Sequence, residues 1–162
     1  MSAHGVVAWF TGLPASGKTT LAAAVAVELR ALGIAPVLLD SDDVRALMPN
    51  LGYDAPSRAA HYRLLASLAA LIAHQGHVVL VAATAHRREF RDAARRIAPA
   101  FLEIYVDTPF DECMQRDPKG IYARGGENVP GIGVEFEAPV TPDLLGRDGA
   151  PTIAQRIADL AR

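Results

Sequence analysis

Residues 6–20 read VVAWFTGLPASGKTT, an apolar run of strand length that is followed directly by the pattern G-x-x-x-x-G-K-[ST]. Every fixed position of the pattern is met, from Gly12 through Gly17 and Lys18 to Thr19. The glycines let the backbone turn its amide groups toward phosphate oxygens, and a helix that begins near Lys18 adds the positive end of its dipole. The stretch therefore predicts a phosphate-binding loop between a strand and a helix.

The motif also assigns roles to single side chains. Lys18 is predicted to reach the β and γ phosphates of ATP, and the Thr19 hydroxyl is predicted to bind Mg²⁺. Other ATP contacts are expected from the rest of the loop and the start of the helix, namely Gly12, Leu13, Pro14, Ala15, Ser16, Gly17 and Thr20. The predicted cofactor is Mg²⁺, with ATP as phosphoryl donor.

Short apolar runs alternate with helical patterns along the rest of the chain. Strands are expected at residues 6–11, 36–40, 77–83 and 101–106. Helices are expected from the loop to Gly33, from about Pro56 to Gly76, over residues 87–97 and from Pro151. This alternation predicts an α/β fold of the P-loop NTPase type, a mostly parallel sheet with helices on both faces and ligands beyond the carboxyl ends of the strands.

Two of the expected helices carry a distinct side-chain pattern. In the helix from Pro56 we expect the large apolar residues to face the core. These residues are Leu64, Leu65, Leu68, Leu71 and Ile72. The helix over residues 87–97 carries a ridge of four arginines at close to i, i+4 spacing, which are Arg87, Arg88, Arg91 and Arg95. A solvated face is favoured for this ridge over a phosphate-facing one.

The segment from Asp117 to Gly149 has no steady period and contains seven glycines. A compact domain rarely keeps so long an irregular segment without a use for it, so residues 117–149 are predicted to form a lid loop. With 162 residues, of which 51% are hydrophobic, the chain is long enough for one substantial core. Residues 1–162 are therefore expected to form a single domain.

Charge and cysteine content narrow the class of protein. The formal net charge of −2 argues against a protein that coats nucleic acid or a membrane surface. Cys113 is the single cysteine and cannot form an internal disulfide, and no secretion signal or membrane span is evident. A cytoplasmic location is the expectation.

The second expected strand ends in an acidic cluster, LDSDDVR at residues 39–45. Asp42 is predicted to accept a hydroxyl proton or to hold a metal-bound water, and Arg45 to neutralise an anionic acceptor. The alternative makes Ser41 or Asp42 the N-cap of a short helix. The third strand ends without Asp or Glu, which favours a kinase that uses the edge from Asp40 to Asp42 over a switch or a motor. Lys18, Asp40 and Asp42 form the predicted catalytic set.

Several further motifs together resemble the adenylylsulfate kinase family. The loop is similar to the family's G-L-S-G-[AS]-G-K-[ST]-T, residues 39–45 to L-D-G-D-N-V-R and residues 51–53 to L-G-F. The most specific likeness is EIYVDTP at residues 103–109, followed by Cys113, Gln115, Arg116, Asp117, Pro118, Lys119, Gly120 and Tyr122. The family transfers the γ-phosphate of ATP to the 3′-hydroxyl of adenosine 5′-phosphosulfate (APS), which gives 3′-phosphoadenylyl sulfate in sulfate assimilation.

The resemblance implies further site residues. Asp42 becomes the catalytic or metal-organising carboxylate, so that Thr19 and Asp42 are the implied metal ligands. Arg45 and Arg58 are implied to grip the phosphosulfate of the acceptor, and Tyr53 to stack on its base. Arg116 joins the ATP site, Lys119 closes over the nucleotides with the lid, and a homodimer is one expected assembly.

The departures from the family pattern lie on the acceptor side. Ser41 and Asp43 replace Gly and Asn, and His61 stands where an Asn contacts the acceptor. Ala85 stands in place of a Ser, and Val129 or Ile132 takes the place of an aromatic residue in a shortened lid. Two alternatives stay open beside APS phosphorylation: a related kinase that acts on another nucleotide-linked anion, such as a cytidine-diphosphate derivative, and a nucleotide-binding regulatory module without turnover.

Overall fold

Strand β1 (Val6–Thr11) lies at the centre of a five-stranded sheet in the order β2-β3-β1-β4-β5. The computed structural model describes residues 4–162. All strand pairs of this sheet are parallel, with Val7 opposite Val79 of β3 on one side and Phe101 of β4 on the other. The other strands are β2 (Val37–Asp40), β3 (Val78–Ala82), β4 (Phe101–Tyr105) and the short β5 (Leu144–Leu145).

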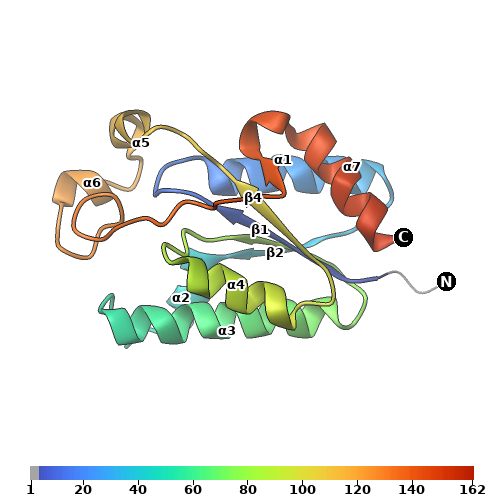
Figure 1. Ribbon diagram of the computed structural model, residues 1–162, viewed down its shortest axis with the longest axis horizontal. Coiled ribbons are helices and arrows are strands. Elements are labelled where there is room, and N and C mark those ends of the chain that lie inside the picture. The colour runs from blue at the N-terminus through green and yellow to red at the C-terminus, as the bar shows by residue number, and fades with distance from the viewer. Residues whose placement is uncertain (1–3) are drawn as a thin grey trace.

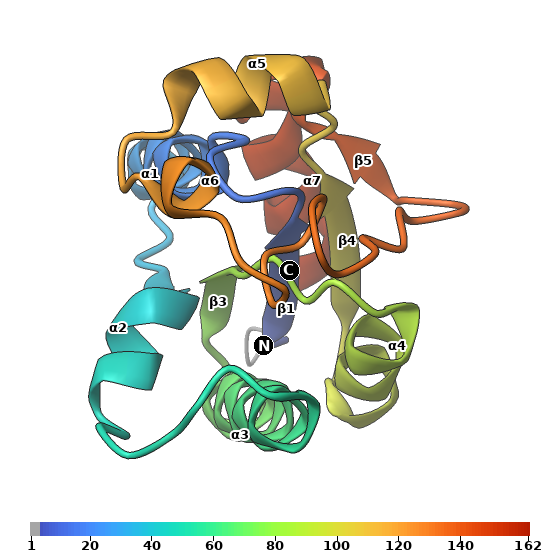
Figure 2. The ribbon, with the colours of Figure 1, turned by 90° about the vertical axis from the view of Figure 1, so that its left-hand side faces the viewer.

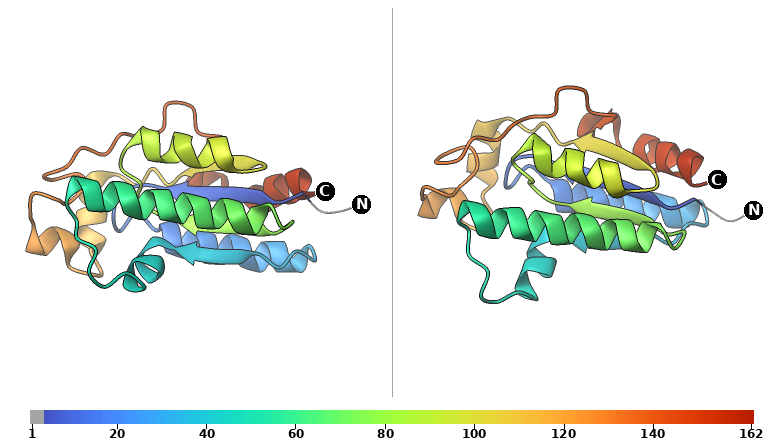
Figure 3. Two further views of the ribbon diagram at one scale, coloured as in Figure 1. Left: turned by 90° about the horizontal axis from the view of Figure 1, so that it is seen from below. Right: turned by 60° about the horizontal axis from the view of Figure 1, so that its bottom comes forward.

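The helices cover both faces of the sheet (Figure 1). Helices α1 (Lys18–Ala31) and α7 (Ala150–Ala161) pack on one face, and α3 (Ala55–Ala73) and α4 (Arg88–Ile97) pack on the other. In Figure 3, α3 runs along the sheet with α4 beside it. The predicted fold class, α/β with helices on both faces, is confirmed.

Every residue of β1 is buried, because its side chains alternate between the two helical layers. Val6, Ala8 and Phe10 join the core that contains α1 and α7, whereas Val7 and Trp9 join the core that contains α3 and α4. An apolar run without alternation is what a strand buried on both faces requires. The strand is therefore fixed from both sides, and the loop that follows it starts from a rigid base.

The carboxyl ends of the strands point to one end of the molecule, and the start of β1 and the end of α7 lie at the other (Figure 1). Three short helices gather at this end: α2 (Ser41–Ala46), α5 (Phe110–Arg116) and α6 (Ile121–Arg124). Seen from that end in Figure 2, α5 and α6 with the loop that follows lie in front of the sheet. Parallel strands thus bring segments that are far apart in the sequence to one edge.

The segment predicted as a lid is more ordered at its ends than expected. It begins with α6, and it ends in β5, which pairs with β4 through Ile104 and Leu144, and in a turn of 3₁₀ helix over Gly146–Asp148. Asp143 anchors this end, because its carboxylate accepts hydrogen bonds from the Glu103 amide at 2.8 Å and from Arg95 at 2.8 Å. The irregular part of the segment therefore ends before residue 143.

The leucines expected to face the core from α3 do so only in part. Leu65 is fully buried, but Leu64 and Leu71 are 45% and 60% exposed. The buried face is instead made largely of alanine, at positions 66, 69, 70 and 73. Small side chains bring the helix close to the sheet, so the larger leucines on the neighbouring faces remain at the surface.

The arginine ridge of α4 is not one uniform face. Arg91 is 1% exposed, and its Nε donates to Glu103 on β4 at 2.9 Å. Its two terminal nitrogens donate to the carbonyl oxygens of Ala85, at 2.6 Å, and Glu137, at 2.5 Å. Arg91 thus joins β4, the end of the β3 segment and the lid by one set of hydrogen bonds, which neither prediction for the ridge included.

This buried ion pair gives a prediction for stability. Glu103→Gln leaves the Arg91 charge buried without its counter-charge, so the free energy of unfolding should fall by roughly 3 kcal/mol in urea denaturation. The matched control is Glu89→Gln, because Glu89 forms an ion pair with Arg87 at 3.1 Å with both side chains more than half exposed. That variant should change stability by less than about 0.5 kcal/mol. Equal effects of the two variants would contradict this account.

Candidate active site

The loop after β1 has the backbone that a phosphate cradle needs. Gly17 has φ 99°, which favours glycine, and a Cβ on Gly12 would lie 2.5 Å from the Val106 carbonyl oxygen. Ala15 also has a positive φ of 62°, at the position where the family pattern has glycine. Thr108 Oγ1 donates to the Ser16 carbonyl oxygen at 2.7 Å, which holds the loop against the segment after β4.

Lys18 lies under this loop. Its Nζ donates to the carbonyl oxygens of Gly12 at 3.0 Å and Leu13 at 2.8 Å. Burial lowers the pKa of Lys18 to about 8, although the charges of Asp42 and Asp40 oppose this shift. An ammonium group that is held by loop carbonyls and poorly hydrated is ready to exchange these contacts for phosphate oxygens.

The carboxylate of Asp40 joins the loop helix to β2. Its Oδ2 accepts a hydrogen bond from the Thr19 hydroxyl at 2.7 Å, and its Oδ1 accepts from the Asp42 amide at 2.9 Å. Asp40, rather than Ser41 or Asp42, is therefore the N-cap of α2. One residue thus serves both as a helix cap and as a neighbour of the predicted metal ligand.

These oxygens suit Mg²⁺. A hydroxyl and a carboxylate are hard donors, and Mg²⁺ is commonly held by one or two protein groups together with waters and substrate phosphates. Within residues 4–162 no group of three or more His, Cys, Asp or Glu side chains forms a closed metal site. Thr19 contacts Asp40 directly, whereas Asp42, the other predicted ligand, points to the lid. The donor set fits a metal that arrives with the nucleotide.

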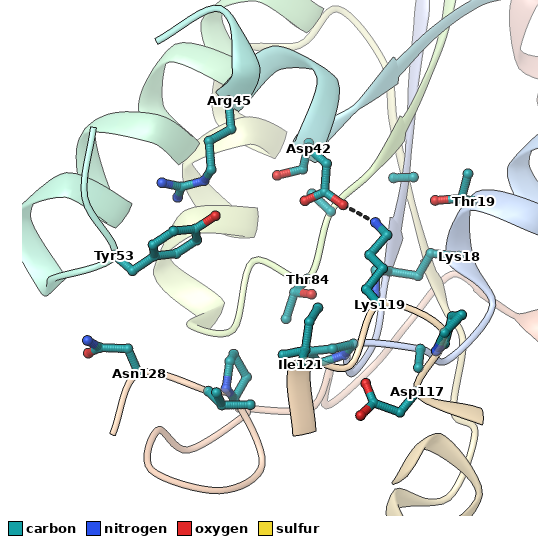
Figure 4. Close-up of a pocket in the computed structure, with 18 of the residues that line it drawn as sticks. Lys18, Thr19, Asp42, Arg45, Tyr53, Thr84, Asp117, Lys119, Ile121 and Asn128 are labelled. Atoms are coloured by element: carbon teal, nitrogen blue, oxygen red, sulfur yellow. Dashed lines mark hydrogen bonds and ion pairs between the residues drawn. The ribbon is translucent and has the colours of Figure 1, made fainter. Parts of the chain in front are cut away.

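Asp42 faces Lys119 across the cavity, and the two side chains form an ion pair (Figure 4). This hydrogen bond is the main reason why the pKa of Lys119 is raised. Both side chains are more than half exposed, so the pair is open to exchange with a ligand. Asp42 is thereby placed between the phosphate loop and the lid.

A second group of side chains forms the opposite wall, where Figure 4 shows Arg45 beside Tyr53. The Arg45 guanidinium lies 4.3 Å from the centroid of the Tyr53 ring and donates to the Gly52 carbonyl oxygen at 2.8 Å. Arg58 lies 5.8 Å from the same ring and donates to the carbonyl oxygen of Asn128 in the lid. Two cations and one aromatic ring therefore come together from α2, α3 and the loop between them.

The lid is attached to the phosphate loop as well. The Tyr122 hydroxyl donates to the Pro14 carbonyl oxygen at 2.7 Å, and Arg116 Nη1 lies 3.5 Å from the Ser16 carbonyl oxygen. Tyr122 packs with Cys113 and Val129 in a small apolar cluster that includes Leu13 and Ala15 of the loop. A movement of the lid would therefore also displace the phosphate loop.

A cavity of about 790 Å³ lies between these walls. Most of the predicted site residues line it, which are Pro14, Ala15, Gly17, Lys18, Thr19, Thr20, Asp40, Asp42, Arg45, Tyr53, Arg58, Arg116, Lys119 and Val129. Gly12, Leu13 and Ser16 belong to the loop but do not line this cavity. Ile132 lines a separate open hollow of about 520 Å³ with Leu13 and Phe136. His61 is fully buried behind Ser41, at 2.7 Å from its hydroxyl.

The cavity also includes residues that sequence reasoning did not select. Thr84 and Asn128 both line it. Thr84 follows β3 at the carboxyl edge, and its carbonyl oxygen accepts a hydrogen bond from Thr11 at 2.7 Å. Position after a strand was a usable signal for Thr84, but nothing local marked Asn128.

The comparison with protein families decides the assignment. The family model described as "Adenylylsulphate kinase" matches residues 4–146. The chain belongs to the adenylylsulfate kinase family. The predicted family and its phosphate-binding fold are confirmed, and the family's members are ATP-dependent kinases.

Individual relatives agree with this assignment. The chain is 42% identical over 164 residues to the bifunctional enzyme NodQ of Azospirillum brasilense, an alignment that includes 95% of this chain. The structure of the Mycobacterium tuberculosis APS kinase CysC in complex with AMPPNP and APS superposes with a TM-score of 0.85 at 38% identity, over 97% of each chain. A hexameric APS kinase from Thiobacillus denitrificans, 23% identical with a TM-score of 0.65 over 98% of this chain and 29% of that one, shares the fold.

The chain spans about a quarter of the length of NodQ, with 26% of that protein aligned. Among residues 4–162, no helix is long and apolar enough to cross a membrane. The match to NodQ therefore concerns one part of a larger protein.

The lowered pKa of Lys18 predicts how ATP affinity depends on pH. Bound phosphates should raise this pKa, so their attraction to Lys18 is fully present below about pH 8 and is lost as the pH rises through the pKa in the complex. Between pH 7 and pH 9 the Kd for ATP should rise about tenfold, with proton uptake on binding at pH 8.5 in calorimetry.

Lys18→Arg is the matched control, because an arginine stays charged over this range. Its affinity for ATP should be lower but nearly independent of pH. If the two proteins show the same slope, Lys18 does not lose its charge in this range.

Proposed function

We propose that this chain transfers the γ-phosphoryl group of ATP to the 3′-hydroxyl of APS and so forms 3′-phosphoadenylyl sulfate. The observation that carries the proposal is the composition of one cavity. The phosphate loop forms one wall, and Arg45, Arg58 and Tyr53 form the other. Asp42 lies between Arg45 and Lys18 in Figure 4. A phosphoryl donor and an anionic nucleotide acceptor are the two ligands that such walls suit.

The positions of the residues support one role for each in this reaction. Lys18 and the loop amides hold the β and γ phosphates, and Thr19 with the Asp40 edge would hold Mg²⁺, which supplies positive charge at the transferred group when bound. Arg45 and Arg58 bind the phosphosulfate, and Tyr53 supports the base. Lys119 and the lid exclude water, so that the hydroxyl of the acceptor reacts in its place.

Asp42 is assigned as the group that accepts the proton of the acceptor hydroxyl. As the 3′-oxygen forms its bond to the γ-phosphorus, the bond from that phosphorus to the β-phosphate oxygen breaks and ADP leaves. The hydroxyl proton passes to the Asp42 carboxylate, which exchanges its contact with Lys119 for one with the acceptor. Side-chain exposure of 63% leaves Asp42 accessible to a ligand in the cavity.

A panel of acceptors tests the proposal. ADP formation is measured at fixed MgATP with APS, with cytidine-diphosphate derivatives and with no acceptor. We expect turnover with APS far above the rate without acceptor. Turnover with another nucleotide-linked anion and not with APS would show that this anion is the acceptor. No turnover with any of them would favour a regulatory module that binds nucleotide.

Asp42→Asn tests the chemical role of the carboxylate. The variant keeps the shape and removes the charge, so kcat should fall by at least about a hundredfold while ATP binding is retained. Asp43→Asn is the matched control, because Asp43 is an adjacent exposed carboxylate outside the cavity lining. It should keep near-normal kcat. A normal kcat for Asp42→Asn would show that the Asp42 carboxylate has only a structural role.

A further inference from the structure

Ser41 and His61, which both depart from the family pattern, are in direct contact although they lie 20 residues apart. Ser41 is the first residue of α2, His61 lies in the second turn of α3, and Ser41 Oγ is 2.7 Å from His61 Nε2. A glycine at position 41 would offer no side chain for this contact. The two departures therefore form one unit.

The protonation of His61 decides the direction of this hydrogen bond. Burial, with a smaller effect of the Arg45 charge, lowers the pKa of His61 to about 4, so the ring is neutral near pH 7 and carries one proton. Its Nδ1 is buried and has no hydrogen-bond partner among residues 4–162. Because a buried N–H without an acceptor is rarer than an unpaired lone pair, the proton belongs on Nε2, which donates to Ser41 Oγ.

This arrangement leaves the hydroxyl proton of Ser41 for another acceptor. Among residues 4–162, the Ser41 hydroxyl has no hydrogen-bond partner other than His61 Nε2. Ser41 lines the cavity, and Arg45 lies four residues further along α2, on the same face of the helix. A hydroxyl donor and a guanidinium therefore face the same space.

We propose that Ser41 binds the acceptor by donating its hydroxyl proton to an anionic oxygen beside Arg45, and that His61 is a positioning residue that orients this hydroxyl without touching the acceptor. The inference rests on the proposed function, because the acceptor is the nucleotide-linked anion of that reaction. It changes the role expected for His61 from a direct contact to a support. The MgATP side is not involved.

A double-mutant cycle tests the pair through steady-state kinetics with APS. Ser41→Ala and His61→Phe should each lower kcat/KM for APS about tenfold, and the double variant should be no worse than Ser41→Ala alone. The KM for MgATP should stay within about twofold, a split that general structural damage would not give. His61→Gln should retain most activity, because its side-chain amide reaches the place of Nε2 and still donates to Ser41.

His74→Phe is the matched control. His74 is exposed at the end of the same helix, where its Nε2 contacts the Ile97 carbonyl oxygen at 2.9 Å, and the change should leave both kinetic constants unaltered. The proposal would be overturned if the losses of kcat/KM for APS in Ser41→Ala and His61→Phe multiply in the double variant. It would also be overturned if the KM for MgATP changes as much as the KM for APS.

An NMR measurement tests the pair without any acceptor. Long-range ¹H–¹⁵N spectra should show His61 with its proton on Nε2 in the wild type, and a changed tautomer ratio in Ser41→Ala. A proton on Nδ1 in the wild type would overturn the proposed orientation. Absence of APS turnover by the wild type would instead overturn the proposed function, and the NMR result would still decide whether His61 donates to Ser41.

Discussion

The Asp40 carboxylate makes the contact on which the arrangement of the cavity depends. It accepts the Thr19 hydroxyl of the phosphate-loop helix and the Asp42 amide of α2, so it fixes the start of α2 relative to the loop. Asp42, Ser41 and Arg45 all lie on the helix that begins at this contact. One carboxylate at the end of β2 therefore holds the start of α2 beside the phosphate-loop helix.

The lid extends this arrangement across the cavity. Lys119 pairs with Asp42, Arg58 donates to the Asn128 carbonyl oxygen, and Tyr122 donates to the Pro14 carbonyl oxygen. Each contact joins the lid to a different part of the site. The ion pair between Lys119 and Asp42 is exposed and weak, whereas the apolar cluster around Tyr122 is buried. The contact of the lid with α2 should therefore open more easily than its contact with the phosphate loop. Nucleotide-linked acceptors would then enter beside α2.

The sequence was sufficient where local rules determine structure. β1 and the phosphate loop follow from an apolar run and a fixed glycine pattern, and Gly33 directly follows the C-cap of α1 with φ 82°. The expected end of α3 at Gly76 was placed too late, because α3 ends at Ala73. Arg45 was selected from the motif at residues 39–45 and Arg58 from the resemblance to the family, and both line the cavity. Contacts between distant segments could not be predicted from the sequence, because no local pattern encodes them.

Three features illustrate this limit. The alanine face of α3 depends on how closely the helix approaches the sheet, and the burial of Arg91 depends on Glu103 and on a lid carbonyl 46 residues away. His61 was expected at the acceptor, and only the three-dimensional contact with Ser41 places it behind the cavity lining. Each depends on packing between elements rather than on the pattern within one element.

The most direct test of the account follows the γ-phosphate itself. ATP that is radiolabelled at the γ position is incubated with APS and the protein, and the products are separated and treated with a 3′-specific phosphatase. The account predicts label in 3′-phosphoadenylyl sulfate that the phosphatase removes, with one ADP formed for each label transferred. Label that appears only as inorganic phosphate, with no labelled nucleotide, would contradict it.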